Sequence, residues 1–193
     1  MRKETIRSIF SHIPELYTPR LYLRAMLVAD AEDMFDYAKD PEVSQFLTWD
    51  AHPDVGFTKK YLTYVGQQYR TGNFFDWAVI HRESGRMIGT CGFTCFRYES
   101  NAAEIGYVLH PAYRGRGLAT EAVRAIMEFG FLELDLHRIE ARYMQENAAS
   151  RQLMDRVGMT FEGLARESLL VKDQYRTIGT CAILQREFME RGM

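Results

Sequence analysis

Alternating and helical spacings of apolar residues predict the first elements of the chain. Residues 20–26, RLYLRAM, alternate between apolar and polar side chains, which predicts a strand. Asp30 follows and is expected to cap a helix. From Phe57 to Tyr69 apolar residues recur every four positions, and Gly72 then supplies a stop, so this segment predicts a second helix.

The middle and the end of the chain are rich in β-forming residues. Residues 74–82 and 87–96 are separated by a short polar turn, which predicts an antiparallel hairpin, and residues 102–109, AAEIGYVL, add a third strand. Residues 161–171 and 175–185 predict a closing hairpin of the same kind. The segment DPEVSQFLTW, residues 40–49, is expected to form an aromatic-bearing loop or a short helix.

Between the two hairpins the pattern changes to strand and helix in turn. A helical stripe is predicted along Leu118, Ala122, Ile126, Phe129 and Leu132. A strand is predicted at residues 137–144, and then a helix that Asn147 caps and Gly158 ends. This order requires at least one parallel crossover within a mixed sheet.

Composition and charge narrow the classes of protein and of partner. The 193 residues, 47% hydrophobic and 26% charged, suit one folded domain, residues 1–193. The 24 Lys and Arg balance 26 Asp and Glu without a long basic run, which disfavours nucleic acid as a partner. No apolar run is long enough for a membrane helix or a secretory signal, so we expect a cytoplasmic protein without a membrane partner.

The cysteines and histidines do not predict a metal site. Cys91, Cys95 and Cys181 are an odd number without zinc-type spacing, and the five histidines are scattered along the chain. Cys91 and Cys95 would lie ~13 Å apart along one strand, too far for a disulfide. We therefore expect free, mostly buried thiols, and no metal.

The segment HPAYRGRGLATEA, residues 110–122, joins a predicted strand to a predicted helix and carries the clearest sign of a ligand site. A helix N-terminus offers unpaired amide groups and a positive dipole end. Gly115 and Gly117 permit a close backbone approach, and Arg114 and Arg116 add positive charge, so a phosphate or pyrophosphate fits best. The alternative is a tight turn with solvated arginines. No lysine follows either glycine, which disfavours a P-loop. The third glycine of the dinucleotide-binding motif is also missing, which disfavours a Rossmann site.

This loop resembles the acetyl-CoA loop, R-x-x-G-x-G/A, of the GNAT superfamily of N-acetyltransferases, with Arg114, Gly117 and Ala119 at the three defined positions. Further segments resemble the branch that contains the ribosomal-protein N-terminal (alanine) acetyltransferases: residues 18–24, 40–47, 103–122, 136–159 and 161–163. The resemblance implies an α/β (α+β) fold with a single GNAT-like domain. Its mixed, mostly antiparallel sheet would carry helices on both faces and a splayed strand pair that binds acetyl-CoA.

The resemblance also implies which residues bind the cosubstrate. The pantetheine arm would pair with the strand end and the pyrophosphate would rest on the loop. The implied cofactor-binding residues are Val108, Leu109, Arg114, Gly115, Arg116, Gly117, Leu118, Ala119, Asn147 and Ser150. Two alternatives are that Val108 and Leu109 are plain sheet core and that Asn147 only caps its helix.

The catalytic residues are expected from the chemistry of amine acetylation. The amine must be neutral to attack the thioester, and the departing thiolate needs a proton. Glu104 is the candidate base, acting through water, with a structural ion pair to an arginine as the alternative. Met154 stands where many relatives have a tyrosine acid, which leaves Ser150 or water to protonate the thiolate. No histidine or lysine adjoins Cys91 or Cys95, so a cysteine nucleophile is disfavoured.

The predicted function is therefore an acetyl-CoA-dependent N-acetyltransferase that acts by direct attack in a ternary complex, as a monomer or homodimer. The alternative is a non-catalytic acyl-CoA-binding sensor or scaffold of the same fold. The acceptor, a protein N-terminus or a small-molecule amine, stays open. Six aromatic residues could line its pocket or belong to the core: Phe46, Trp49, Phe74, Phe75, Trp77 and Tyr98.

Overall fold

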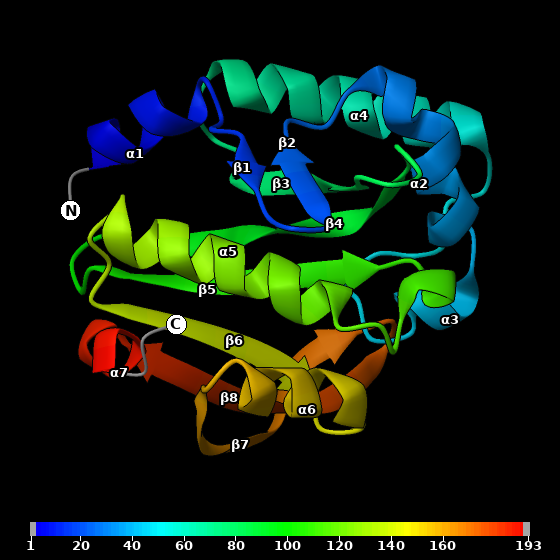
Figure 1. The fold of residues 1–193 in the computed structure, drawn as a ribbon. Coiled ribbons are helices and arrows are strands. Elements are labelled where there is room, and N and C mark those ends of the chain that lie inside the picture. The colour runs from blue at the N-terminus through cyan, green and yellow to red at the C-terminus, as the bar shows by residue number, and fades with distance from the viewer. Residues whose placement is uncertain (1–2, 191–193) are drawn as a thin grey trace.

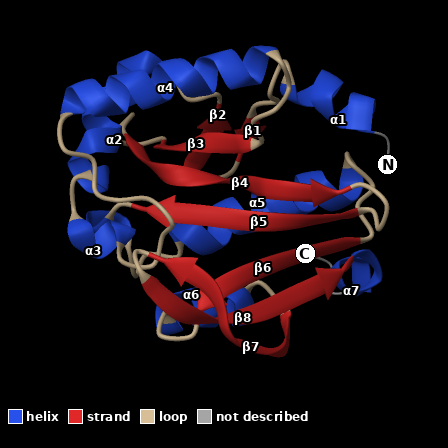
Figure 2. Cartoon of the chain, turned by 180° about the vertical axis from the view of Figure 1, so that it is seen from behind, coloured by secondary structure: helices blue, strands red, loops and turns tan. Residues whose placement is uncertain are grey.

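The computed structural model describes residues 3–190, and the eight strands in that range form one sheet (Figures 1 and 2). The strand order is β1-β2-β3-β4-β5-β6-β8-β7. Every pair of neighbours is antiparallel except β5 and β6. The strands are β1 (Leu16–Tyr17), β2 (Leu21–Arg24), β3 (Asp76–His81), β4 (Met87–Arg97), β5 (Ala102–Leu109), β6 (Arg138–Met144), β7 (Thr160–Val171) and β8 (Gln174–Leu184).

Helices cover both faces of this sheet, as the family resemblance implied. The α-helices are α1 (Lys3–Phe10), α2 (Ala31–Ala38), α3 (Pro41–Ser44), α4 (Val55–Arg70), α5 (Leu118–Leu132), α6 (Ala148–Arg156) and α7 (Gln185–Glu190). Two 3-10 turns lie at Val28–Asp30 and Pro111–Tyr113. On β3, Trp77 and Val79 pack into the core under α1 and α5, whereas Ala78 and Ile80 pack into the core under α2 and α4. The two-residue period of a strand thus divides β3 between two apolar layers.

The parallel pair β5 and β6 is joined for only three residues. Ala102 pairs with Arg138, and the last pair is Glu104 with Glu140. Beyond Glu104 the two strands diverge, while β5 stays paired with β4 as far as Leu109. The sheet therefore opens at the carboxyl end of β5, where the chain turns into α5 (Figure 1).

Most elements predicted from the sequence are confirmed, including both hairpins, the crossover from β5 through α5 to β6, and the short helix α3. Asp30 precedes α2, but its carboxylate accepts hydrogen bonds from Arg24 and from the amide of Leu27 instead of capping the helix. The helix predicted from Phe57 is confirmed as α4, although Phe57 itself is 48% exposed. The predicted stripe of α5 is wrong at Leu132, which is 52% exposed.

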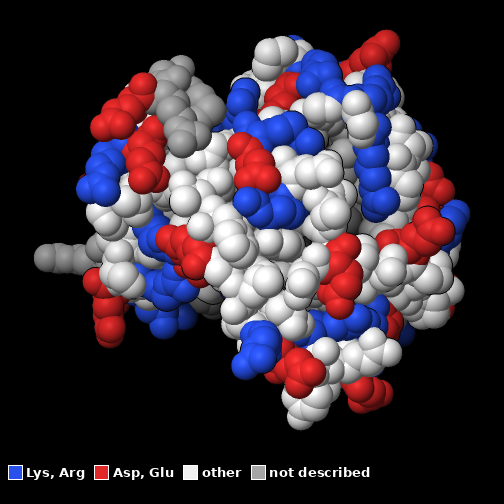
Figure 3. All heavy atoms as spheres, turned by 90° about the horizontal axis from the view of Figure 1, so that it is seen from below, with Lys and Arg blue, Asp and Glu red and all other residues white. Residues whose placement is uncertain are grey.

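Two of the three cysteines are buried, and charges of both signs share the surface (Figure 3). Cys91 and Cys181 are buried free thiols, but Cys95 is exposed, contrary to the expectation of buried cysteines. Among residues 3–190, no cluster of three or more His, Cys, Asp or Glu side chains could hold a metal ion, and no helix is long and apolar enough to span a membrane. The face in Figure 3 intersperses basic and acidic side chains.

Candidate active site

The loop between β5 and α5 has the backbone conformation that its glycines permit. Gly115 and Gly117 adopt φ angles of +73° and +76°, in the left-handed region that costs other residues free energy. Gly117 is the N-cap of α5, so the amide groups of Leu118, Ala119 and Thr120 lie in the first helical turn without intrahelical acceptors. The loop thus combines amide donors that lack intrahelical acceptors with the positive end of a 15-residue helix.

A cavity of about 710 Å³ lies beside this loop, where β5 and β6 diverge. Residues of β5, of the loop with the start of α5, and of α6 contribute to its wall, and the segment around α3 covers one side. The lining residues are Glu42, Val43, Gln45, Phe46, Leu47, Tyr107, Val108, Leu109, Tyr113, Arg114, Gly115, Gly117, Leu118, Ala119, Thr120, Asn147, Ala149, Ser150, Leu153 and Arg156.

The structure brings together at this cavity all the implied cofactor-binding residues except Arg116. The guanidinium of Arg116 lies over the ring of Tyr113, 5.6 Å from its centroid, and the Arg116 carbonyl accepts a hydrogen bond from Arg20. Asn147 caps α6, since its Oδ1 accepts from the amide of Ser150 at 3.1 Å, and it also lines the cavity. Both readings of Asn147 are therefore compatible with its position.

Tyr107 is a functional candidate that the sequence did not single out. Its hydroxyl lies 2.7 Å from Ser150 Oγ, and both residues line the cavity. Burial raises the pKa of Tyr107 to about 12, although the hydrogen bond with Ser150 opposes that rise. The phenol stays protonated over the physiological range of pH, so it is a permanent hydroxyl donor. Met154, at the usual tyrosine position, is 1% exposed and packs in the core.

Glu104 lies away from this cavity and has a cationic partner. Its Oε2 accepts a hydrogen bond from Nε of Arg142, two residues beyond the last residue of β6 that pairs with β5, at 2.8 Å. The Glu104 side chain is 13% exposed and does not line the cavity. The geometry matches the alternative of a structural ion pair, and the role of Glu104 as a base stays a prediction.

The aromatic residues divide between core and cavity. Trp77 is fully buried, and Phe75 and Tyr98 pack against the same core. Trp49 and Phe74 pack against the core under α2 and α4. Of the six aromatic candidates only Phe46 lines the cavity, and it also packs against Val171, next to the turn of the β7–β8 hairpin.

Sequence comparison shows which known proteins the chain resembles. The family model described as "Acetyltransferase (GNAT) domain" matches residues 20–160. The chain is 34% identical to the uncharacterized N-acetyltransferase p20 of Bacillus licheniformis, over 90% of this chain and 97% of that protein. It is 29% identical to the ribosomal protein uS5-alanine N-acetyltransferase of Escherichia coli, over 86% of this chain and 89% of that enzyme.

The fold comparison agrees with the sequence comparison. The crystal structure of an acetyltransferase of the GNAT family from Bacillus anthracis superimposes with a TM-score of 0.80 at 26% identity. The match covers 90% of this chain and 99% of that one. The splayed strands, the glycine-bearing loop and the cavity thus occur within a fold shared along nearly the whole chain.

Proposed function

The chain belongs to the GNAT acetyltransferases, which use acetyl-CoA, and we propose that it acetylates a primary amine, at a protein N-terminus or on a small molecule, in a ternary complex. The observation that carries this proposal is the cavity in the opened sheet. It is bounded on one side by the end of β5, which is no longer paired with β6, and on the other by the start of α5. An extended thioester arm and a pyrophosphate need such neighbours.

The backbone of β5 supports a specific placement of the thioester. Within a strand, the amide and carbonyl of one residue face the same neighbour. The carbonyl of Val108 packs against Gly89 of β4, where a Cβ atom would lie 2.1 Å from it. The carbonyl of Leu109 instead accepts from Arg114 Nε at 3.4 Å, on the loop side. The amide of Leu109 therefore faces the opening and is the proposed donor to the thioester oxygen as negative charge develops there.

We infer that Tyr107 and Ser150 act together on the departing sulfur. When Tyr107 donates to Ser150 Oγ, the Ser150 proton is free to point into the cavity. A phenol with a pKa of about 12 is a weaker acid than an ordinary thiol of about 8.5, so full proton transfer from Tyr107 to a thiolate is uphill. The pair is therefore expected to stabilise the thiolate by hydrogen bonding.

The overall proton balance follows from the reaction. The amine nitrogen bonds to the acetyl carbon, the carbon–sulfur bond breaks, and one amine proton ends on the CoA sulfur. A base must hold that proton in between, and Glu104, acting through water, remains the proposed candidate despite its ion pair with Arg142. We expect this chemistry to take place in the cytoplasm, in a monomer or homodimer.

A thiol-release assay with acetyl-CoA and a panel of amines tests the proposal. The panel should include peptides with free N-terminal alanine or serine, polyamines and free amino acids. Release that depends on both acetyl-CoA and one class of amine is expected. Tight CoA binding without release on any amine would favour the non-catalytic sensor, against which the acetyltransferase relatives argue.

A further inference from the structure

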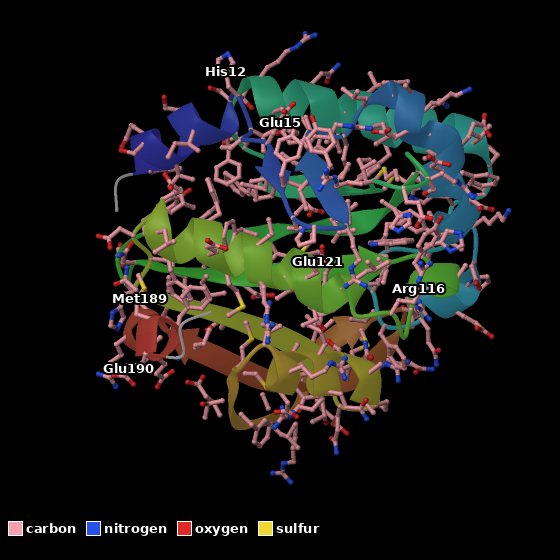
Figure 4. The ribbon with its side chains drawn as sticks, in the orientation of Figure 1. His12, Glu15, Arg116, Glu121, Met189 and Glu190 are labelled. Atoms are coloured by element: carbon pink, nitrogen blue, oxygen red, sulfur yellow. The ribbon has the colours of Figure 1, made fainter. Side chains whose placement is uncertain are left out.

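One arginine ties the start of the sheet to the proposed pyrophosphate loop. Arg20 precedes β2, and its Nε donates to Glu121 Oε2 at 2.7 Å, in the first turns of α5. Its Nη1 donates to the carbonyl oxygen of Arg116 at 2.8 Å. Figure 4 shows Glu121 on α5 and Arg116 in the loop that leads into it. One guanidinium therefore holds a helix side chain and the loop backbone at once.

Glu121 is itself fixed in place. Its Oε1 accepts from Thr18 Oγ1 at 2.6 Å and from the amide of Arg20 at 2.9 Å. The side chain of Glu121 is only 14% exposed. Burial raises the pKa of Glu121, but the hydrogen bonds from Thr18 and Arg20 outweigh burial and hold the pKa below its usual value. The carboxylate stays charged and anchors the arginine.

The bond to the Arg116 carbonyl orients the next amide. In a planar trans peptide unit the carbonyl oxygen and the amide hydrogen point in opposite directions. Because the Arg116 carbonyl is drawn toward Arg20, the amide hydrogen of Gly117 points away from Arg20. Gly117 lines both the 710 Å³ cavity and a second hollow of about 590 Å³, whereas Arg20 lines only the second.

We propose that Arg20 is a positioning residue for acetyl-CoA: with Glu121 it holds the Arg116–Gly117 peptide so that the loop amides face the pyrophosphate. Arg20 acts through the backbone and does not touch the cosubstrate, since it lies outside the cavity wall. This inference rests on the proposed binding of acetyl-CoA at the loop. It predicts that loss of Arg20 weakens the binding of acetyl donors that carry the pyrophosphate and leaves the binding of those that lack it unchanged.

The chain offers a matched control in Arg82. Its Nη1 donates to the carbonyls of Thr18 and Pro19 at 2.8 and 3.2 Å, so it tethers the same segment, and within residues 3–190 its side chain makes no hydrogen bond to the loop. An Arg82→Gln variant therefore loosens the neighbourhood of Arg20 and leaves the Arg116 carbonyl held. Arg20→Gln removes both the ion pair and the donor to the loop.

The experiment measures CoA affinity by calorimetry, and kcat/KM for acetyl-CoA and for S-acetylpantetheine, which lacks the pyrophosphate. We expect Arg20→Gln to weaken CoA binding about 10-fold or more, with kcat/KM for S-acetylpantetheine within about twofold of the wild type. Arg82→Gln should stay within about twofold on both donors. If Arg20→Gln does not fold, Arg20→Lys decides on the same measurements, because a single ammonium cannot reproduce the forked contact.

Two results would overturn the inference: unchanged CoA affinity in the Arg20 variant, or equal losses on both donors, which indicate a merely structural role. A wild-type protein that binds no CoA would refute the proposed function instead. The wild-type calorimetry thus separates the two failures.

Discussion

Removal of the Tyr107 hydroxyl tests whether Tyr107 and Ser150 stabilise the departing thiolate. Tyr107→Phe keeps the ring and deletes the one group that lies 2.7 Å from Ser150 Oγ. A hydrogen bond that supports a developing charge contributes about 1.5–3 kcal/mol, so we expect kcat to fall about 10- to 160-fold. The KM for acetyl-CoA should change little, because the loop and the end of β5 are untouched.

The pair Tyr107 and Ser150 can be tested as a unit. Ser150→Ala should lower kcat about as much as Tyr107→Phe does. The double variant should lower kcat little more than either single variant, because both substitutions break the same hydrogen-bonded pair beside the sulfur. Free thiol release at saturating acetyl-CoA and amine measures kcat, and circular dichroism checks the fold. Full kcat in Tyr107→Phe, or losses that multiply in the double variant, would refute the reasoning.

Three further outcomes follow from single residues. Gly117→Val should weaken CoA binding about 10-fold or more in a calorimetric titration. The φ angle of Gly117 is +76°, so a β-branched residue forces the loop to move. Native affinity in a natively folded variant would contradict this. Glu104→Gln should lower turnover roughly 10²- to 10⁴-fold on strongly basic amines if Glu104 is the base, whereas equal activity at neutral pH would leave it as the partner of Arg142. Burial raises the pKa of Asp76 to about 7. The folded state therefore keeps a proton that the unfolded chain releases near pH 4. The free energy of unfolding should fall as the pH rises from about 4 through 7. Asp76→Asn should flatten that fall between pH 5 and 8 in urea titrations, and parallel pH profiles of the two proteins would count against it.

The sequence predicts well what is local in the chain. The β-forming residues at 102–109, the glycines at 115 and 117 and the cap at Asn147 are each set by neighbours in sequence, and the structure has a strand, left-handed turns and a capped helix there. Phe57 and Leu132 satisfy the same helical spacing, yet they are 48% and 52% exposed. Periodicity identifies a face but not how far the neighbouring layer extends.

The contacts that shape the site could not be predicted in this way, because each joins distant parts of the chain. Tyr107 and Ser150 are 43 residues apart, and Arg20 and Glu121 are 101 residues apart. The partner of Glu104 depends on the register of a parallel pair only three residues long. A hydroxyl or carboxylate gains its role here from a residue on another element of the fold, and no spacing in the sequence encodes that neighbour.

The most direct test of the central claim is transfer of an isotopically labelled acetyl group. The protein is incubated with labelled acetyl-CoA and the panel of amines, and the products are identified by mass spectrometry. We predict that the wild type places the label on the nitrogen of at least one primary amine, and that Gly117→Val does so more slowly at limiting acetyl-CoA. Label that stays on CoA with every amine, in a protein that binds CoA, would contradict the assignment of this cavity as the active site of an N-acetyltransferase.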